Sequence, residues 1–162
     1  MSITRFVTVQ LASLAVGLTA AAAPVFAQAT HVLVPASQVQ WGPAPPVLPA
    51  GAQIAVLEGN PSEKGPITLR LQLPANYEIP AHWHSMAERV TVLSGAFNVG
   101  MGDKLDRGAS QTLEPGGFVS LPATMRHFAW TAAPTVVQIN LEGPFDIFYV
   151  NPADNPQTQT KR

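Results

Sequence analysis

The chain has 162 residues, of which 46% are hydrophobic and 12% charged, and its formal net charge is −1. This length and composition suit one domain with a buried core, and the charge offers no basic surface for nucleic acid. The chain has no cysteine, which excludes disulfides, thiolate metal sites and a cysteine nucleophile.

The first segment has the layout of a secretory signal peptide. Arg5 precedes an apolar run from Phe6 to about Ala23, and Val25 and Ala27 have the spacing of a cleavage site. An uncleaved membrane anchor is the alternative, because a run of this length nearly spans a bilayer. The small residues favour cleavage, so we assign residues 1–27 to a signal peptide. We expect an exported protein that is free of the membrane and, in a bacterium, lies in the periplasm.

Residues 28–65 are predicted to form a proline-rich arm and the first strands. The stretch PASQVQWGPAPPVLPAG is expected to be extended or looped, either around the outside of a barrel or at a sheet edge. At the other end, residues 151–162 are polar with two prolines, and we expect a flexible tail.

Residues 66–150 are predicted to form a succession of short strands. In GPITLRLQLP, polar residues alternate with one apolar face that carries Ile67, Leu69, Leu71 and Leu73. The segments ERVTVLSGAFNVGMGDK and GASQTLEPGGFVSLP each favour two strands around a turn, and RHFAWT, TVVQINLEG and FDIFYV follow. Strands at intervals of about 8–12 residues favour an all-β sandwich or barrel. We expect no helix after the signal peptide.

The stretch AHWHSMAER places two histidines and a glutamate among apolar residues. Residues two apart share a face on a strand but not on a helix, so His82 and His84 can meet one ion only if the chain is extended. Glu88 has the same parity, but four extended residues span about 13 Å. Residues 85–87 must therefore turn the chain so that Glu88 opens the next strand beside the histidines.

A further candidate ligand is His127, on a later short strand, whereas His31 lies at the start of the mature chain and is given no role. Zinc and other borderline metals prefer sets of imidazoles. A pair of surface histidines with a solvated glutamate is the alternative interpretation. We favour a metal site because most of the mature chain's imidazoles fall in two apolar strand contexts.

These residues resemble the two sequence motifs of the cupin superfamily. The first motif, in HWHSMAERVTVLSG, has His-x-His, three residues, Glu, six residues and Gly, here His82, His84, Glu88 and Gly95. The second motif, in GGFVSLPATMRH, has Gly, five residues, Pro and a later His, here Gly116, Pro122 and His127. The resemblance covers the chain from about Ile67 to Leu141. It implies a cupin-type double-stranded β-helix, a jelly-roll-like barrel.

Three positions depart from the motifs. Asn76 and Thr124 stand where the family often has Gly, and Thr131 stands where it often has Asn. Asn tolerates a left-handed turn as Gly does, so the change at Asn76 is minor. No ligand position is lost.

The resemblance implies one divalent transition metal inside the barrel, bound by His82, His84, Glu88 and His127. Three imidazoles and one carboxylate leave two positions of an octahedron free. Such a site suits Fe, Mn, Ni or Cu better than a closed structural Zn site. The free positions could take dioxygen, water or a bidentate substrate.

Strand parity predicts the wall of this site. The residues expected to face inward with Glu88 are Val90, Val92, Ser94, Phe97, Val99, Met101, Leu69 and Leu71. No second carboxylate or lysine shares their parity on these strands. Trp83 is expected on the exterior, covered by a homodimer partner or by the segment around Trp41. Residues near the mouth that receive no assigned role are Tyr77, Glu78, Met125 and Arg126.

Two functions of different classes fit these features. The first is a metal-dependent enzyme of the dioxygenase type that acts on a small organic molecule. The second is a non-catalytic exported protein that binds a small ligand or is stabilised by the metal, and a structural or storage role is the weakest alternative. One fold supports many activities, so the resemblance does not choose between them.

Overall fold

The computed structural model describes residues 31–159, and the predicted signal peptide lies outside them. The strands are β1 (Gly42–Pro43), β2 (Gln53–Glu58), β3 (Gly65–Leu73), β4 (Glu78–Trp83), β5 (Glu88–Ser94), β6 (Phe97–Met101), β7 (Gln111–Leu113), β8 (Phe118–Leu121), β9 (His127–Trp130), β10 (Thr135–Gly143) and β11 (Phe148–Tyr149). The helical turns are η1 (Ala36–Gln38), η2 (Arg107–Ala109), η3 (Pro152–Asp154) and α1 (Pro156–Gln159). Within residues 31–159, every helix is too short or too polar to cross a membrane.

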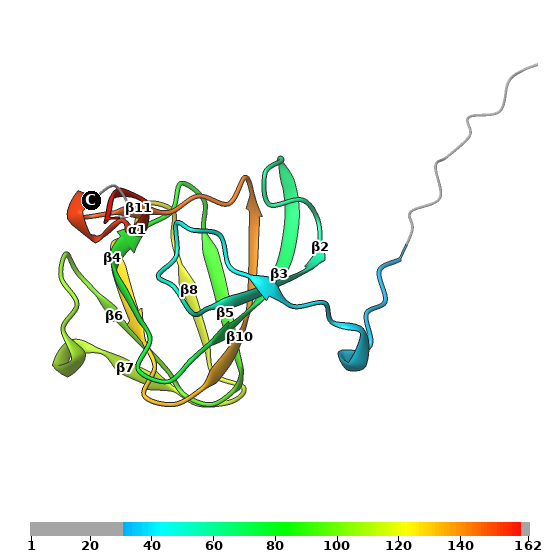
Figure 1. The fold of residues 1–162 in the computed structure, drawn as a ribbon, viewed down its shortest axis with the longest axis horizontal. Coiled ribbons are helices and arrows are strands. Elements are labelled where there is room, and N and C mark those ends of the chain that lie inside the picture. Colours follow the sequence, from blue (N-terminus) through cyan, green and yellow to red (C-terminus); the bar gives the residue numbers. More distant parts are fainter. Residues whose placement is uncertain (1–30, 160–162) are drawn as a thin grey trace, which may run out of the picture. The chain divides into compact units, whose positions relative to one another are not determined.

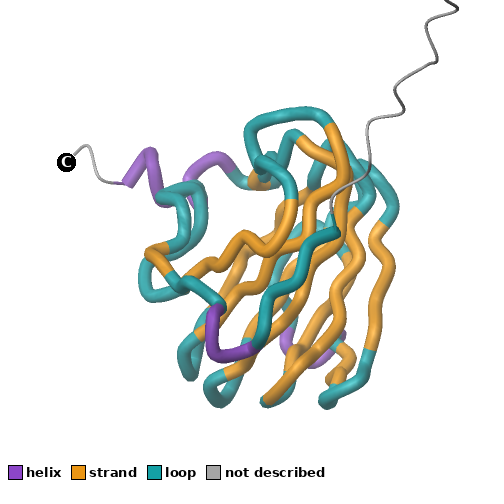
Figure 2. Tube along the Cα trace, turned by 90° about the vertical axis from the view of Figure 1, so that its right-hand side faces the viewer, coloured by secondary structure: helices purple, strands orange, loops and turns teal. Residues whose placement is uncertain are grey.

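The strands form two antiparallel sheets, as the all-β prediction requires. One sheet has the order β1-β2-β3-β10-β5-β8, and the other has the order β11-β4-β9-β6-β7. Figure 1 shows β4, β6 and β7 on one side and β3, β5 and β10 on the other. Loops connect the strands at both ends of this sandwich (Figure 2). The proline-rich arm supplies β1 at a sheet edge, one of the two places expected for it.

The long strands β3 and β10 build the centre of the larger sheet. The four apolar residues predicted for one face of β3 are all buried, and Leu69 is fully so. Val137 and Ile139 of β10 stand opposite Leu71 and Leu69 and are buried with them. This alternation of apolar and polar residues fixes the register, because a slip by one residue would turn the apolar face to water.

Two of the residues predicted to face inward are exposed. The pairing of β5 with β10 skips Leu93, so that Val92 stands opposite Val137 and Ser94 opposite Val136. This bulge reverses the parity of Ser94 and turns it outward. Met101 keeps the inward parity, but it lies at the end of β6 beyond the last residue paired with β7 and is 48% exposed.

Trp83 lies on the outside of β4, as predicted, but its cover was not foreseen. Its ring stacks on Phe148 with the centroids 4.3 Å apart and the planes at 21°. Phe148 stands opposite Trp83 in the pairing of β11 with β4. The exterior aromatic residue is therefore covered by the chain's own last strand, and the homodimer stays a prediction.

The C-terminal segment forms short helical turns where we expected no helix. The side chains of Asn151 and Asn155 accept hydrogen bonds from the backbone N–H groups of Ala153 and Gln157. Such bonds satisfy the free N–H groups at the start of a turn and favour η3 and α1.

Candidate metal centre

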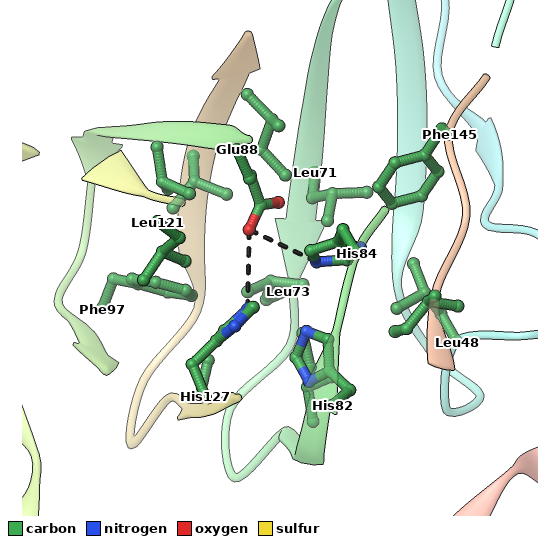
Figure 3. Close-up of a pocket in the computed structure, with 16 residues that line it drawn as sticks. Leu48, Leu71, Leu73, His82, His84, Glu88, Phe97, Leu121, His127 and Phe145 are labelled. Atoms are coloured by element: carbon green, nitrogen blue, oxygen red, sulfur yellow. Dashed lines mark ion pairs between the residues drawn. The ribbon is translucent and has the colours of Figure 1, made fainter. Parts of the chain in front are cut away.

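A small cavity lies between the two sheets, and the predicted ligands surround it (Figure 3). Its volume is about 30 Å³, which leaves room for about one water molecule. The larger sheet contributes Glu88 from β5, and the smaller sheet contributes His82 from β4 and His127 from β9. The rest of the wall is apolar: Leu48, Leu71, Leu73, Ile79, Val90, Phe97, Leu121, Ala129, Val137, Ile139, Phe145 and Ile147.

The three histidines of the motifs converge. His82 and His127 stand opposite each other in the pairing of β4 with β9, and His84 follows directly after β4. All three are buried, and one ring nitrogen of each lies within 4.8 Å of those of the others. As predicted, residues 85–87 turn the chain so that Glu88 opens β5 beside them. The three histidines could hold a metal ion.

Backbone carbonyls hold the three imidazoles in one tautomer. Nδ1 of His82 donates to the carbonyl oxygen of Pro80 over 2.7 Å, and Nδ1 of His127 donates to that of Met125 over 3.0 Å. Nδ1 of His84 donates to the carbonyl oxygen of Asp146. Because Nδ1 carries the proton, the Nε2 lone pair of each neutral ring is free to bind a cation.

Glu88 completes the cluster with a buried carboxylate. Its Oε2 lies 3.5 Å from Nε2 of His84 and 3.6 Å from Nε2 of His127. Nε2 of His84 is buried and makes no hydrogen bond within the described residues. In the neutral tautomers, lone pairs of two nitrogens face a carboxylate oxygen, an arrangement that is repulsive unless a cation lies between them. The donor set therefore fits a divalent metal ion.

Burial and the neighbouring groups shift the pKa values of three members of the cluster. Burial and the neighbouring His127 and His84 lower the pKa of His82 to about 3, so it is neutral at physiological pH. Burial opposes the charged form of Glu88, but its interactions with His127 and His84 outweigh this effect. Burial also opposes the charged form of His84, but the interactions with Glu88 and Asp146 outweigh it. The pKa of Glu88 therefore lies below its ordinary value, and that of His84 lies above its own.

The segment between β10 and β11 supports His84, and sequence reasoning missed it. The backbone carbonyl of Asp146 accepts the hydrogen bond from His84. The carboxylate of Asp146 accepts two more, from the backbone N–H of Ser85 over 2.8 Å and from the Ser85 hydroxyl. The Phe145 ring stacks on the His84 ring with the centroids 5.5 Å apart. Asp146 lies 62 residues from His84 in the chain, so no local pattern could have revealed this contact.

The departures from the cupin motifs fall at structurally demanding positions. Asn76 has φ 56° and Thr124 has φ 64°, so both occupy the left-handed region that glycine adopts readily. Thr124 also donates its backbone N–H to the carbonyl oxygen of His84 over 2.9 Å. The hydroxyl of Thr131 donates to the carbonyl oxygen of Pro74 and accepts from the N–H of Tyr77, which ties the turn before β4 to the end of β9.

None of the residues noted near the mouth lines the cavity. The hydroxyl of Tyr77 donates to the carbonyl oxygen of Pro49, and Glu78 and Arg126 form surface ion pairs with Arg107 and Asp103. Met125 contributes only its carbonyl, to His127. His31 is exposed, which agrees with its lack of an assigned role.

Solved structures with this architecture include cupins and enzymes. A proposed acetylacetone dioxygenase from Methylibium petroleiphilum is 20% identical with a TM-score of 0.62, over 82% of this chain and 89% of that one. The polyketide cyclase RemF from Streptomyces resistomycificus is 16% identical with a TM-score of 0.61, over 82% and 94%. An RmlC-like cupin from Shewanella frigidimarina is 16% identical with a TM-score of 0.54, over 71% and 92%. At these identities the likeness shows the fold alone.

A comparison with proteins of curated function found no match. Residues 14–148 match the family described as a domain of unknown function, DUF4437. Because this match covers most of the chain, the protein belongs to the DUF4437 family, and its fold is that of the cupins.

Proposed function

We propose that the protein binds one divalent transition-metal ion through His82, His84, Glu88 and His127. One observation carries this proposal. Three backbone carbonyls hold the Nδ1–H groups of the histidines, so that the Nε2 lone pairs point into the cavity beside the buried carboxylate of Glu88. Such a buried cluster of three imidazoles and one carboxylate is costly unless a cation neutralises it. Three nitrogens and one oxygen favour Fe, Mn, Ni, Cu or Zn over Mg or Ca.

We propose further that the site performs dioxygenase chemistry on a small organic molecule. A bound metal ion would supply the redox or Lewis-acid chemistry, and both atoms of dioxygen would enter the substrate, so no external reductant is needed. The chain's own part is to hold the donors and exclude water. Glu88 is the only carboxylate among the cavity-lining residues, and it faces the imidazoles. The fold of the Methylibium protein, a proposed acetylacetone dioxygenase, supports this proposal.

Metal analysis tests the first proposal. Protein purified without added metal is expected to contain close to one transition-metal ion per chain, and dialysis against a chelator followed by titration gives the affinity. Glu88→Gln keeps the shape of the side chain but removes its charge, and it should lower the affinity by at least about tenfold. An unchanged affinity would remove Glu88 from the ligands, and a wild-type chain that takes up no ion would overturn the proposal.

Oxygen uptake tests the second proposal. The metal-loaded protein is offered acetylacetone and other β-diketones, catechols, flavonols and small keto acids under an oxygen electrode, with the Glu88→Gln protein as the control. Uptake that depends on one substrate class and on the metal is the expected result. Fe- and Cu-loaded protein that is inert towards the whole panel would contradict an oxygenase.

A non-catalytic binding role is the second candidate, and the size of the cavity favours it. The space beside the histidines holds about one water molecule in the described conformation. A metal that only stabilises the barrel needs no more room than this. Thermal unfolding with and without metal, beside the oxygen assay, separates the two roles: a stabilised but inert protein supports the binding role.

We also propose that the protein is exported. The layout of residues 1–27 supports cleavage before Gln28. The intact mass of the mature protein recovered from cells, together with its presence in the periplasmic fraction, tests both points.

A further inference from the structure

The connection between β1 and β2 covers the metal cavity with one leucine. We call residues 44–52 the lid segment. Its ends are tied by a hydrogen bond from the Ala44 N–H to the Ala52 carbonyl oxygen, over 3.0 Å. Most of the segment is exposed or half-buried, but the Leu48 side chain is only 4% exposed. In Figure 3, Leu48 and Phe145 lie on one side of the histidines, and Phe97 and Leu121 lie on the other.

Leu48 separates two spaces of very different size. On its inner side it lines the cavity of about 30 Å³ beside the histidines. On its outer side it lines a surface groove of about 530 Å³. A shift of this one side chain would therefore join a groove large enough for a small organic molecule to a cavity that now holds about one water.

Two buried tyrosines hold the lid segment closed on either side of Leu48. The hydroxyl of Tyr149 donates to the carbonyl oxygen of Val47 over 2.8 Å, and the hydroxyl of Tyr77 donates to that of Pro49 over 2.5 Å. Both tyrosines lie outside the lid segment, Tyr149 on β11 and Tyr77 just before β4. Leu48 and Ala52 of the lid belong to the hydrophobic core, and Ala44 and Val47 pack against it. Besides this packing, the two tyrosine hydrogen bonds attach the lid, and they can break without unfolding either sheet.

The composition of the lid segment suits movement as one piece. Its three prolines fix local φ angles, so the segment between Ala44 and Pro49 is stiff. Gly51, with φ 106°, stands beyond the prolines and can absorb a change in backbone direction.

The lining of the groove indicates what could pass. Apart from Leu48 and Gln157, its residues are proline, alanine and glycine, and none of them carries a charge. The cavity behind Leu48 is apolar apart from the proposed ligands. An uncharged, largely apolar small molecule would lose least hydration along this route.

We propose that Leu48 is a gate and a specificity-determining residue: opening of the lid segment admits uncharged, largely apolar small molecules from the surface groove to the three histidines. This inference rests on the proposed function for its purpose, since the gate would serve the metal. Its geometry is independent of whether a metal binds.

Chemical labelling of the metal-free, full-length mature protein tests the gate. Diethyl pyrocarbonate is small and uncharged, modifies unprotonated imidazole, and is too large for the closed cavity. Mass spectrometry measures the rate of modification at His82, His84 and His127, and exposed His31 is the internal standard. In the wild-type chain the three cavity histidines should react at least about tenfold more slowly than His31.

Variants then separate gating from loss of stability. Leu48→Ala should raise the labelling rate of the cavity histidines about tenfold. Tyr77→Phe and Tyr149→Phe should each raise it roughly fivefold, because each removes one hydrogen bond from the closed lid. Leu69→Ala is the matched control, because Leu69 is equally buried but lines neither the cavity nor the groove. Equal rates in Leu48→Ala and Leu69→Ala, or wild-type cavity histidines as reactive as His31, would overturn the gate.

A charged and an uncharged reagent of the same shape test the ligand class. Iodoacetamide should reach the cavity histidines of Leu48→Ala faster than iodoacetate does, after each rate is normalised to His31. Equal normalised rates would overturn the proposed selectivity for uncharged molecules. Because these measurements use metal-free protein, failure of the gate and failure of metal binding are read independently.

Discussion

The three histidines of the cluster are supported in two different ways. His82 and His127 each donate Nδ1–H to a carbonyl two residues earlier on the same stretch of chain. His84 donates to the carbonyl of Asp146, from the segment between β10 and β11. Two imidazoles are thus oriented by carbonyls on their own stretches of chain, and the third depends on a contact 62 residues away. The locally supported pair should tolerate changes elsewhere, whereas the His84 position should respond to distant ones.

Removal of a locally supported imidazole should have the largest effect on metal binding. His127→Ala deletes a proposed ligand. No other described side chain can replace it, because His82, His84 and Glu88 already point into the cluster. We expect the affinity to fall by more than about a hundredfold, since loss of a supporting residue alone costs up to that much. Competition with a chromophoric chelator measures the change. His31→Ala is the control, and an effect of equal size there would contradict the assignment.

In metal-free protein, His82 and His84 should contribute to stability with opposite responses to pH, because burial lowers the pKa of His82 whereas Glu88 raises that of His84. The pKa of His82 lies far below its ordinary 6.5, so its contribution to stability is full above pH 6.5 and is lost as the pH falls towards 3. The pKa of His84 is raised, mainly by Glu88, so its contribution is full below pH 6.5 and is lost as the pH rises through the folded pKa. NMR of the imidazole nitrogens should find His84 protonated at pH 6.5 and His82 neutral at pH 5. The reverse order would contradict this account of the cluster.

The distant support of His84 should have a smaller effect than a ligand. Asp146→Ala keeps the carbonyl but removes the two hydrogen bonds to Ser85 that fix the segment. We expect the metal affinity to fall about tenfold, the lower end of the range for supporting residues. A cobalt(II)-loaded protein should also show a shifted visible spectrum, which a purely structural loss would not produce. Asp103→Ala, which breaks an exposed ion pair with Arg126, is the matched control, and equal losses in both variants would remove Asp146 from the support.

The same distinction explains how much of the molecule the sequence predicts. Alternation along β3 and the spacing of His82 and His84 are local patterns, and they predicted the buried face and the extended pair of imidazoles. The resemblance to the cupin motifs joined His127, from a later segment, to this set. The bulge at Leu93, which turned Ser94 outward, depends on the pairing of two strands and leaves no local signal. The same holds for Asp146 and Leu48. Their roles come from loops that fold back over the cavity, and parity says nothing about where such loops lie.

The turn at Thr124, which contacts the backbone of His84, should give the smallest effect. Thr124 is β-branched and has φ 64°, and its N–H bonds the carbonyl of His84, so its strain is held in place by the fold. Thr124→Gly should relieve more strain than it costs in chain entropy and stabilise the protein by about 0.5–1 kcal/mol, or about 2–4 °C in Tm. Asn76→Gly is the matched control at φ 56°, where Asn already tolerates the left-handed region and we expect a change near zero. Thermal unfolding of both variants measures the difference. If Thr124→Gly leaves Tm unchanged or lowers it, the turn after β8 carries no excess strain, and the departure from the motif at Thr124 has no energetic cost.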